Sequence, residues 1–259
     1  EIMAVSIDKV YQKVLAFANK EQRGYITPQE FNLFADQAQM EIFEQYFYDL
    51  NQFKRLPGNQ GEYTDVVSII KDKISPFEYW AVSSNITVRN KYGDIFIDND
   101  IPNLYRLGEV SIIYDNGNMH IVCEQLTPRE HALYLQSHLT KPTKARPYFV
   151  KYTNVYNRMK IFPYPRNQDG TEITSASNNT AKVRADYTRK PTKPNWGYVV
   201  VNNKPLYNSS RSMDFELHSS EEPELVYRIL AFAGIAMQKP NLTQAVVALE
   251  SNKVQQEKQ

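Results

Sequence analysis

Apolar residues change their spacing twice along the chain, and the two changes divide it into three parts. Up to residue 80 they recur every three or four positions, which is the period of a helix that buries one face. Between residues 81 and 218 they alternate with polar residues in short runs, as in half-buried strands. From residue 219 to residue 259 the helical spacing returns. The pattern predicts an α+β fold in which N-terminal helices precede an antiparallel β-sheet or sandwich, and C-terminal helices pack back on the N-terminal ones.

Three helices are predicted before residue 80. Ser6 is a suitable N-cap for the first helix, and Gly24 ends it. The segment TPQE at residues 27–30 predicts the start of the second helix, because its threonine, proline and glutamate suit the N-cap, first-turn and capping-box positions. This helix should extend to about Leu50 and measure about 35 Å. Thr64 is a suitable N-cap for a third, shorter helix.

The apolar stripe of the second predicted helix is wider than a helix lying on one core needs. Its members are Phe31, Phe34, Ala35, Ala38, Ile42, Phe43, Tyr46, Phe47 and Leu50. Two interpretations fit this width. Part of the stripe packs against another chain, or the helix is buried between two helices of its own domain.

Short aromatic and β-branched segments predict the strands of the middle part. Three of them organise the region, at residues 147–152, 158–163 and 182–187. Val183 and Ala185 fall on the same face of the last one, as in a half-buried antiparallel strand. Further strands are predicted at residues 86–88, 94–97, 109–114 and 119–123.

Turn and cap residues connect these predicted strands. The sequence DNGN at residues 115–118 contains Asn-Gly, the strongest local signal for a hairpin. Asn202-Asn203 indicates a second, smaller hairpin between residues 197–201 and 204–207. The segment TPRE at residues 127–130 repeats the capping box and predicts a short helix at residues 128–138, inserted within the β region.

Two helices are predicted after residue 219. Ser219 or Ser220 caps the first, and acidic residues follow where the helix dipole favours negative charge. Residues 225–237 are apolar almost all round, so we expect this helix to be buried on most sides. Pro240 breaks it. A last helix is predicted from the spacing of Leu242, Ala245, Val246 and Leu249.

Composition narrows the classes of function. The chain has 259 residues, 18 tyrosines and a formal net charge of +1, so no global positive field recruits nucleic acid. Residues 81–218 carry 18 basic and 12 acidic side chains, whereas residues 1–80 carry 8 and 12. This imbalance suits subunits that complement one another or a surface facing a polyanion, although ordinary solvated surface is the simpler explanation. The many tyrosines suit interfaces and strands equally well.

Cysteine content and hydropathy exclude further classes. A single cysteine, Cys123, excludes a disulfide framework and a cysteine-rich metal site. No apolar run approaches the roughly 20 residues that span a bilayer, and no secretory signal is recognisable. No membrane partner is therefore expected.

Motifs for catalysis, metal binding and cofactor binding are missing from the sequence. The glycine-containing loops lack the Gly-Lys-Ser/Thr of a phosphate-binding loop, and the four histidines lack metal-binding spacing. Cys123 and His120 should lie on opposite faces of one strand, which argues against a catalytic dyad. We therefore expect no enzymatic activity, no catalytic residues, no cofactor and no metal. Because two carboxylates can meet in space without any sequence spacing, a carboxylate-dependent hydrolase is kept as the least favoured alternative.

Four stretches, together with the order of the predicted elements, carry a resemblance to a known family. They are residues 25–32 with the long helix, residues 146–152, residues 161–165 followed by 183–191, and residues 221–238. A strand ending in Pro-x-Pro, a strand ending in Tyr-x-x-x-Pro and a buried helix after an acidic start resemble the neck proteins of tailed bacteriophages. These are the head–tail adaptors or connector-ring proteins that dock beneath the portal. The β content is more similar to adaptors of short-tailed phages or ring proteins of crAss-like phages than to the smallest, all-helical adaptors.

The resemblance implies a structural virion protein, assembled in the host cytoplasm and located in the neck or tail of the particle. It implies a homo-oligomeric ring, commonly a dodecamer, that binds the portal protein and the next tail or neck ring protein. The ring would extend the DNA channel used for genome ejection, with only transient, non-specific contact with the genome.

Broad apolar helix faces also suit a closed, heterologous interface repeated around an axis. The candidate interface residues are Phe34, Phe43, Phe47, Leu50, Tyr227, Leu242, Val246, Leu249 and Val254. The main alternative is a carbohydrate-binding or fibre-attachment β module of the virion. Trp80 and Trp196 nevertheless suit core anchors better than sugar-stacking platforms.

Overall fold

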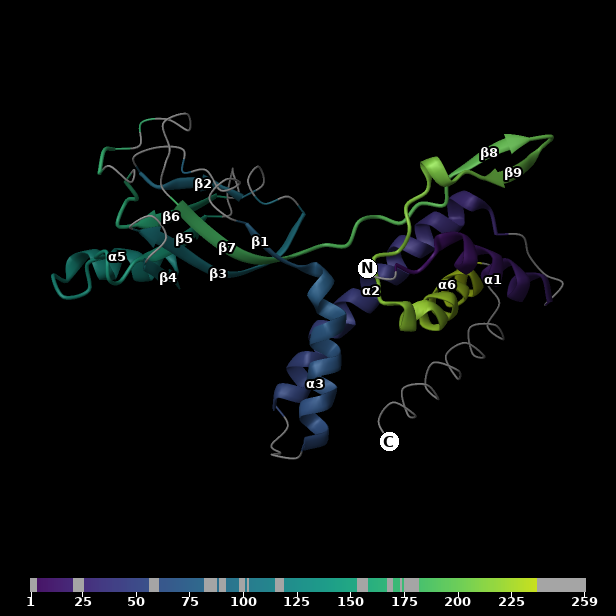
Figure 1. The fold of residues 1–259 in the computed structure, drawn as a ribbon, viewed down its shortest axis with the longest axis horizontal. Helices are drawn as coiled ribbons and strands as arrows, with labels where there is room; N and C mark the ends of the chain where they lie inside the picture. Colours follow the sequence, from purple (N-terminus) through teal and green to yellow (C-terminus); the bar gives the residue numbers. More distant parts are fainter. Residues whose placement is uncertain are drawn as a thin grey trace. The chain divides into compact units, whose positions relative to one another are not determined.

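The computed structural model describes residues 4–20, 26–55, 61–81, 88, 92–97, 101, 103–114, 119–152, 158–166, 170–172, 174 and 182–236. Helices lie at both ends of the described chain and β-strands between them, which confirms the predicted α+β fold (Figure 1). The chain forms two compact units, one of residues 1–76 with 191–259 and one of residues 77–190.

The helical unit contains the described helices from both ends of the chain. They are α1 (Ile7–Lys20), α2 (Pro28–Arg55), α3 (Gly61–Ile74) and α6 (Glu222–Ala236). Helix α6 packs against α1 and α2, and α3 packs against α2, so the C-terminal helix does pack back on the N-terminal ones. None of the described side chains between residues 225 and 234 is exposed, which confirms the burial expected for this helix. The second predicted C-terminal helix lies outside the described residues.

Capping boxes start two helices as the sequence predicts. At α2, the Thr27 backbone N–H donates to Glu30 Oε2 at 2.9 Å, and the Glu30 backbone N–H donates to Thr27 Oγ1 at 3.3 Å. The same pair of bonds joins Thr127 and Glu130 at the start of α5 (Pro128–Gln136), which is the predicted inserted helix. Each box satisfies two N–H groups that a helix start leaves without partners. Helix α2 extends to Arg55, beyond the predicted end near Leu50.

The second unit contains one large sheet. Within the described residues, the strands follow the order β1-β7-β3-β4-β5-β6-β2. Their bounds are β1 Glu78–Ala81, β2 Asp94–Phe96, β3 Leu104–Tyr114, β4 Met119–Leu126, β5 Tyr148–Tyr152, β6 Arg158–Phe162 and β7 Lys182–Arg189. The strands at residues 94–97, 109–114 and 119–123 and the three organising strands were predicted in these places. Residues 86–87 and the turn at 115–118 lie outside the described residues, although β3 and β4 pair antiparallel on either side of that turn.

One strand pair corrects the prediction of an antiparallel sheet. Strands β4 and β5 run parallel, with Glu124 opposite Tyr148 and Leu126 opposite Val150. Parallel neighbours need a crossover connection of a dozen or more residues. The segment between these strands, which contains α5, provides this crossover and therefore makes the pairing parallel.

Side chains alternate between the two faces of the sheet. One face carries the main core, which includes Val110, Cys123, Phe149, Ile161 and Val183, with Tyr187 packed against it. The alternation predicted for residues 182–187 is therefore confirmed. The other face carries a second cluster over β5 and β6, formed by Leu126, Tyr148, Val150 and Phe162, against which Tyr134 of α5 packs.

Residues 191–218 belong to the helical unit, whereas the sequence pattern groups them with the β region. Hydrogen bonds explain this membership. Gln39 of α2 donates to the Thr192 carbonyl at 2.8 Å and accepts from the Glu216 backbone N–H at 3.1 Å. Phe215 forms a β-bridge with Val5 and is fully buried. Residues 198–207 of this segment pair with each other as strands, and these hydrogen bonds and this bridge hold the rest of the segment in the helical unit.

Candidate functional site

A small hairpin in the helical unit presents a run of exposed apolar side chains. It consists of β8 (Tyr198–Val201) and β9 (Lys204–Tyr207), which pair antiparallel (Figure 1). Asn202 and Asn203, both with positive φ, form its two-residue turn, which confirms the predicted second hairpin. Five of its described apolar side chains are between 40% and 60% exposed: Val199, Val200, Val201, Leu206 and Tyr207.

Both faces of this hairpin are apolar. Val199 pairs with Leu206 on one face, and Val200 and Tyr207 occupy the other, because neighbouring residues of a strand point to opposite faces. A two-stranded hairpin is marginally stable by itself in water. Clustered exposed apolar side chains of this kind are typical of protein–protein interfaces. We therefore treat the β8–β9 hairpin as the candidate functional site.

The base of the hairpin is held in place by Trp196. Its ring lies 4.3 Å from the ring of Tyr11 and 5.8 Å from that of Tyr198, and its indole N–H donates to Asp8 Oδ1 at 3.0 Å. Trp196 is buried, as expected for a core anchor. Gly197 follows it, and a Cβ at this position would lie only 2.6 Å from the Arg211 carbonyl carbon. The exposed strands therefore extend from a rigid, buried base, and this rigidity favours a preorganised binding surface.

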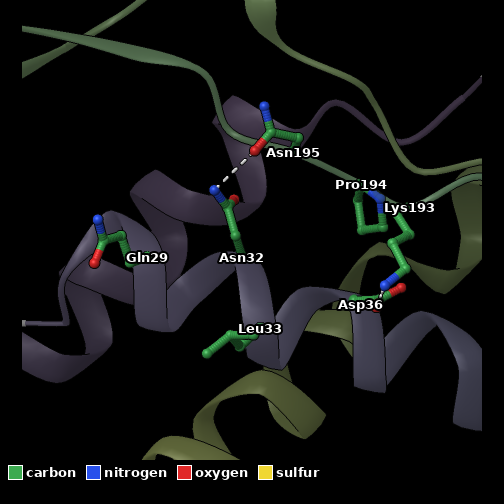
Figure 2. Close-up of a pocket in the computed structure, with 7 residues that line it drawn as sticks. All are labelled: Gln29, Asn32, Leu33, Asp36, Lys193, Pro194 and Asn195. Atoms are coloured by element: carbon green, nitrogen blue, oxygen red, sulfur yellow. Dashed lines mark hydrogen bonds and ion pairs between the residues drawn. The ribbon is translucent and has the colours of Figure 1, made fainter.

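A shallow pocket lies in the same unit, between the first turns of α2 and residues 193–195. Its volume is about 440 Å³, and its lining residues are Gln29, Asn32, Leu33, Asp36, Lys193, Pro194 and Asn195 (Figure 2). Asn32 donates to Asn195 Oδ1 at 3.0 Å, and Lys193 Nζ lies 3.4 Å from Asp36 Oδ2. Leu33 is 71% exposed. The pocket therefore offers an exposed apolar side chain beside two pairs of polar side chains that bind each other, which suits a protein contact better than a catalytic site.

The charged cluster near the start of α6 is structural. Glu221 is buried and its Oε1 lies 2.6 Å from Lys73 Nζ of α3. Arg228 binds Glu224 within α6 and Glu41 of α2. Burial and the nearby Glu221 raise the pKa of Tyr46, so its hydroxyl stays protonated. These contacts connect α6 with α2 and α3, and ion-pair networks of this kind perturb pKa values without any catalytic role.

The candidate interface residues that the structure describes differ in how deeply they are buried. Phe43 is fully buried, with its ring 5.1 Å from that of Phe47, so it follows the alternative of burial within its own unit. Phe34 is partly buried and stacks on Phe232 of α6 at 6.4 Å. Leu50 and Tyr227 are partly buried. The remaining candidates lie outside the described residues: Leu242, Val246, Leu249 and Val254.

The exposed hairpin surface was missed at the level of sequence, although a signal for it exists. Three consecutive valines, Val199-Val200-Val201, lie in a two-stranded hairpin. Successive strand residues point to opposite faces, so such a run must place apolar side chains on both of them. A hairpin outside any larger sheet has no layer to cover both faces.

The described part of the chain brings together neither a metal-binding cluster nor the Cys123–His120 pair. Among the described residues, no group of three His, Cys, Asp or Glu side chains could hold a metal ion. Cys123 is buried and its pKa is raised to about 12 by that burial, whereas His120 is exposed, so the two lie apart on opposite faces. Within the same described residues, no helix combines the length and hydropathy needed to cross a bilayer.

Comparisons with known proteins leave the family of this chain undefined: no protein-family model matches it, and no curated protein matches it at a significant level.

Proposed function

We propose that this protein is a structural virion protein of a tailed phage, which forms a neck ring between the portal and the tail. Its sequence resemblance to head–tail adaptors supports this proposal, and so does an α+β fold whose first and last described helices pack together. In the ring, each copy contacts two neighbours, the portal protein above and the next neck or tail protein below. The ring extends the DNA channel and has no enzymatic activity of its own.

The observation that carries the proposal is the β8–β9 hairpin with its five exposed apolar side chains. A ring of identical subunits uses a heterologous interface, in which one surface of each copy binds a different surface of the next. The hairpin supplies the first surface. The shallow pocket around Leu33 supplies the second, since its exposed leucine can pack against the hairpin valines.

Mass measurement tests this proposal. Twelve copies of the 30.1 kDa chain have a mass of about 360 kDa, which mass photometry separates from a monomer. We expect the purified chain, alone or mixed with the portal protein encoded in the same genome, to form such a ring. A wild-type chain that stays monomeric even with the portal present would refute the ring.

A pair of matched variants tests the role of the hairpin. Val200→Asp places a charge on the 60% exposed hairpin valine, and we expect it to leave the fold intact and abolish assembly. Leu139→Asp makes the same kind of change at a 92% exposed leucine in the segment after α5, and we expect assembly to be unchanged. If Val200→Asp assembles as the wild type does, the hairpin is not the interface.

A saccharide-binding role on the virion is the second candidate, because a pair of exposed tyrosines on the sheet unit favours it.

A further inference from the structure

Two half-exposed tyrosines form a corner at one edge of the large sheet. Tyr92 lies just before β2, and Tyr164 lies just after β6. Their rings are 5.9 Å apart at an interplanar angle of 84°, and each residue is 48% exposed. One ring therefore meets the other edge-on, and together they form an angled aromatic surface, called here the Tyr92–Tyr164 platform.

Tight backbone packing fixes the position of the platform. Gly93 has a φ of +69°, and a Cβ on it would lie 2.7 Å from the Ile161 carbonyl oxygen. The Ile161 backbone N–H donates to the Gly93 carbonyl at 3.3 Å. On the other side, the Tyr164 ring lies 5.2 Å from the ring of Phe162, which is buried in the cluster under α5. Both rings are thus held by rigid elements before any ligand arrives.

Charged groups border the platform, and they already neutralise one another in part. Lys160 Nζ lies 5.9 Å from the centre of the Tyr92 ring and 3.5 Å from Asp94 Oδ1. Arg158 Nη1 lies 3.9 Å from the same oxygen, and its guanidinium is 5.7 Å from the Tyr152 ring. The rim therefore offers the Lys160 ammonium as a donor, held beside a carboxylate that Arg158 also contacts.

The combination of an angled aromatic surface and compensated charges favours one class of ligand over another. A groove for single-stranded nucleic acid pairs stacking rings with uncompensated positive charge along the backbone. Here a carboxylate lies beside both cations, which weakens attraction for a polyanion. A pyranose ring instead presents C–H groups that pack on an aromatic face, and neighbouring hydroxyls that both donate and accept hydrogen bonds.

We propose that the Tyr92–Tyr164 platform binds a neutral hexopyranose unit of a polysaccharide. The sugar ring packs on the tyrosine rings, and its hydroxyls bind the groups at the rim, with Lys160 as a donor. The inference rests on the sheet unit alone and does not depend on ring assembly. It places on this unit a recognition site for a glycan, separate from the hairpin.

Titration of the full chain with defined oligosaccharides tests the proposal. The probes are cellohexaose, maltohexaose and mannohexaose, followed by isothermal titration and by saturation-transfer NMR. We expect at least one of them to bind with a Kd between about 0.1 and 1 mM, as befits a small, exposed site. Tyr164→Ala and Tyr92→Ala should each weaken that binding about tenfold or more, since each removes one stacking face.

Two control variants separate binding from folding. Tyr164→Phe keeps the aromatic face and should bind within about threefold of the wild type. Tyr48→Ala removes a tyrosine that is 68% exposed on α2, and it should leave saccharide binding unchanged. Circular dichroism melting curves identify any variant that fails to fold, in which case the remaining platform variant provides the comparison.

Three outcomes would overturn the proposal. The first is absence of binding to all three neutral hexaoses by the folded wild-type chain. The second is binding that persists in both alanine variants. The third is a different ligand in place of a saccharide. Salt-sensitive binding of a twelve-nucleotide oligothymidylate would assign the platform to single-stranded DNA. Loss of subunit assembly in Tyr164→Ala would assign it to a protein contact.

Discussion

Replacing Gly93 by alanine should destabilise the sheet unit by about 3 kcal/mol. Two effects add at this position. A non-glycine residue in the left-handed region costs about 1 kcal/mol. The new Cβ would also lie 2.7 Å from the Ile161 carbonyl oxygen and 3.0 Å from Pro165 Cδ, and forcing apart packed groups costs about 1 to 3 kcal/mol. Part of that loss comes from weakening the hydrogen bond that the Ile161 N–H donates to the Gly93 carbonyl, because the two groups move apart.

The chain offers a matched control at Gly170. It belongs to the same unit and has a φ of +83°, but a Cβ there would meet nothing within 4 Å. Gly170→Ala therefore carries the backbone cost without the clash, and we expect a loss of about 1 kcal/mol. The difference of about 2 kcal/mol between the two variants isolates the close approach of residue 93 to β6.

Urea unfolding followed by far-UV circular dichroism measures the two losses. Hydrogen exchange of the peptide covering residues 158–166 then locates them, because amide protection should fall in Gly93→Ala and not in Gly170→Ala. Equal losses in the two variants, within about 0.5 kcal/mol, would refute the steric reasoning. Gly93→Ala should also weaken saccharide binding without removing a ring, because Tyr92 is its neighbour in the chain.

Three further predictions concern a buried ion pair, a helix cap and a thiol. Glu221→Gln should lower the free energy of unfolding in urea by about 2 kcal/mol, because it leaves the partly buried Lys73 ammonium without its charged partner. Glu222→Gln removes the partner of the more exposed Lys13 and should cost at most about 0.5 kcal/mol. Thr127→Ala removes the capping box of α5 and should cost about 1 kcal/mol in the same assay, with reduced amide protection in that helix; Arg129→Ala at its exposed surface should change little. The Cys123 thiol has its pKa raised to about 12 by burial, so it stays protonated in the folded state while the unfolded thiol ionises above about pH 9. Stability should therefore fall between pH 9 and pH 12 by up to about 1.4 kcal/mol per pH unit more in the wild type than in Cys123→Ala, and equal slopes would contradict the buried thiol.

Local chemistry accounts for the parts of the fold that sequence reasoning predicted. The capping boxes at residues 27–30 and 127–130 start helices because their hydrogen bonds close within four residues. The turn at Asn202-Asn203 forms for a similar reason, since asparagine tolerates positive φ. The alternation of residues 182–187 also predicts its own burial, because it depends only on the two-residue period of a strand.

The partners of each element could not be predicted in this way. The parallel pairing of β4 with β5 depends on where the chain returns after α5. The sequence pattern groups residues 191–218 with the β region. The hydrogen bond from Gln39 to Thr192 and the β-bridge between Val5 and Phe215 instead hold them in the helical unit. The broad stripe of α2 left two interpretations open, and the structure buries Phe43 and leaves Phe34 and Leu50 partly buried.

By itself, the sequence determines the α+β class, the starts of the capped helices and which residues of a strand share a face. These properties follow from interactions between residues close in the chain, whose geometry repeats wherever the same residues occur. The tertiary structure decides which apolar surfaces remain uncovered, among them the β8–β9 hairpin and the Tyr92–Tyr164 platform. Exposure is the outcome of competition among distant segments for burial, and hydropathy records only that a side chain can be buried, not whether another segment reaches it.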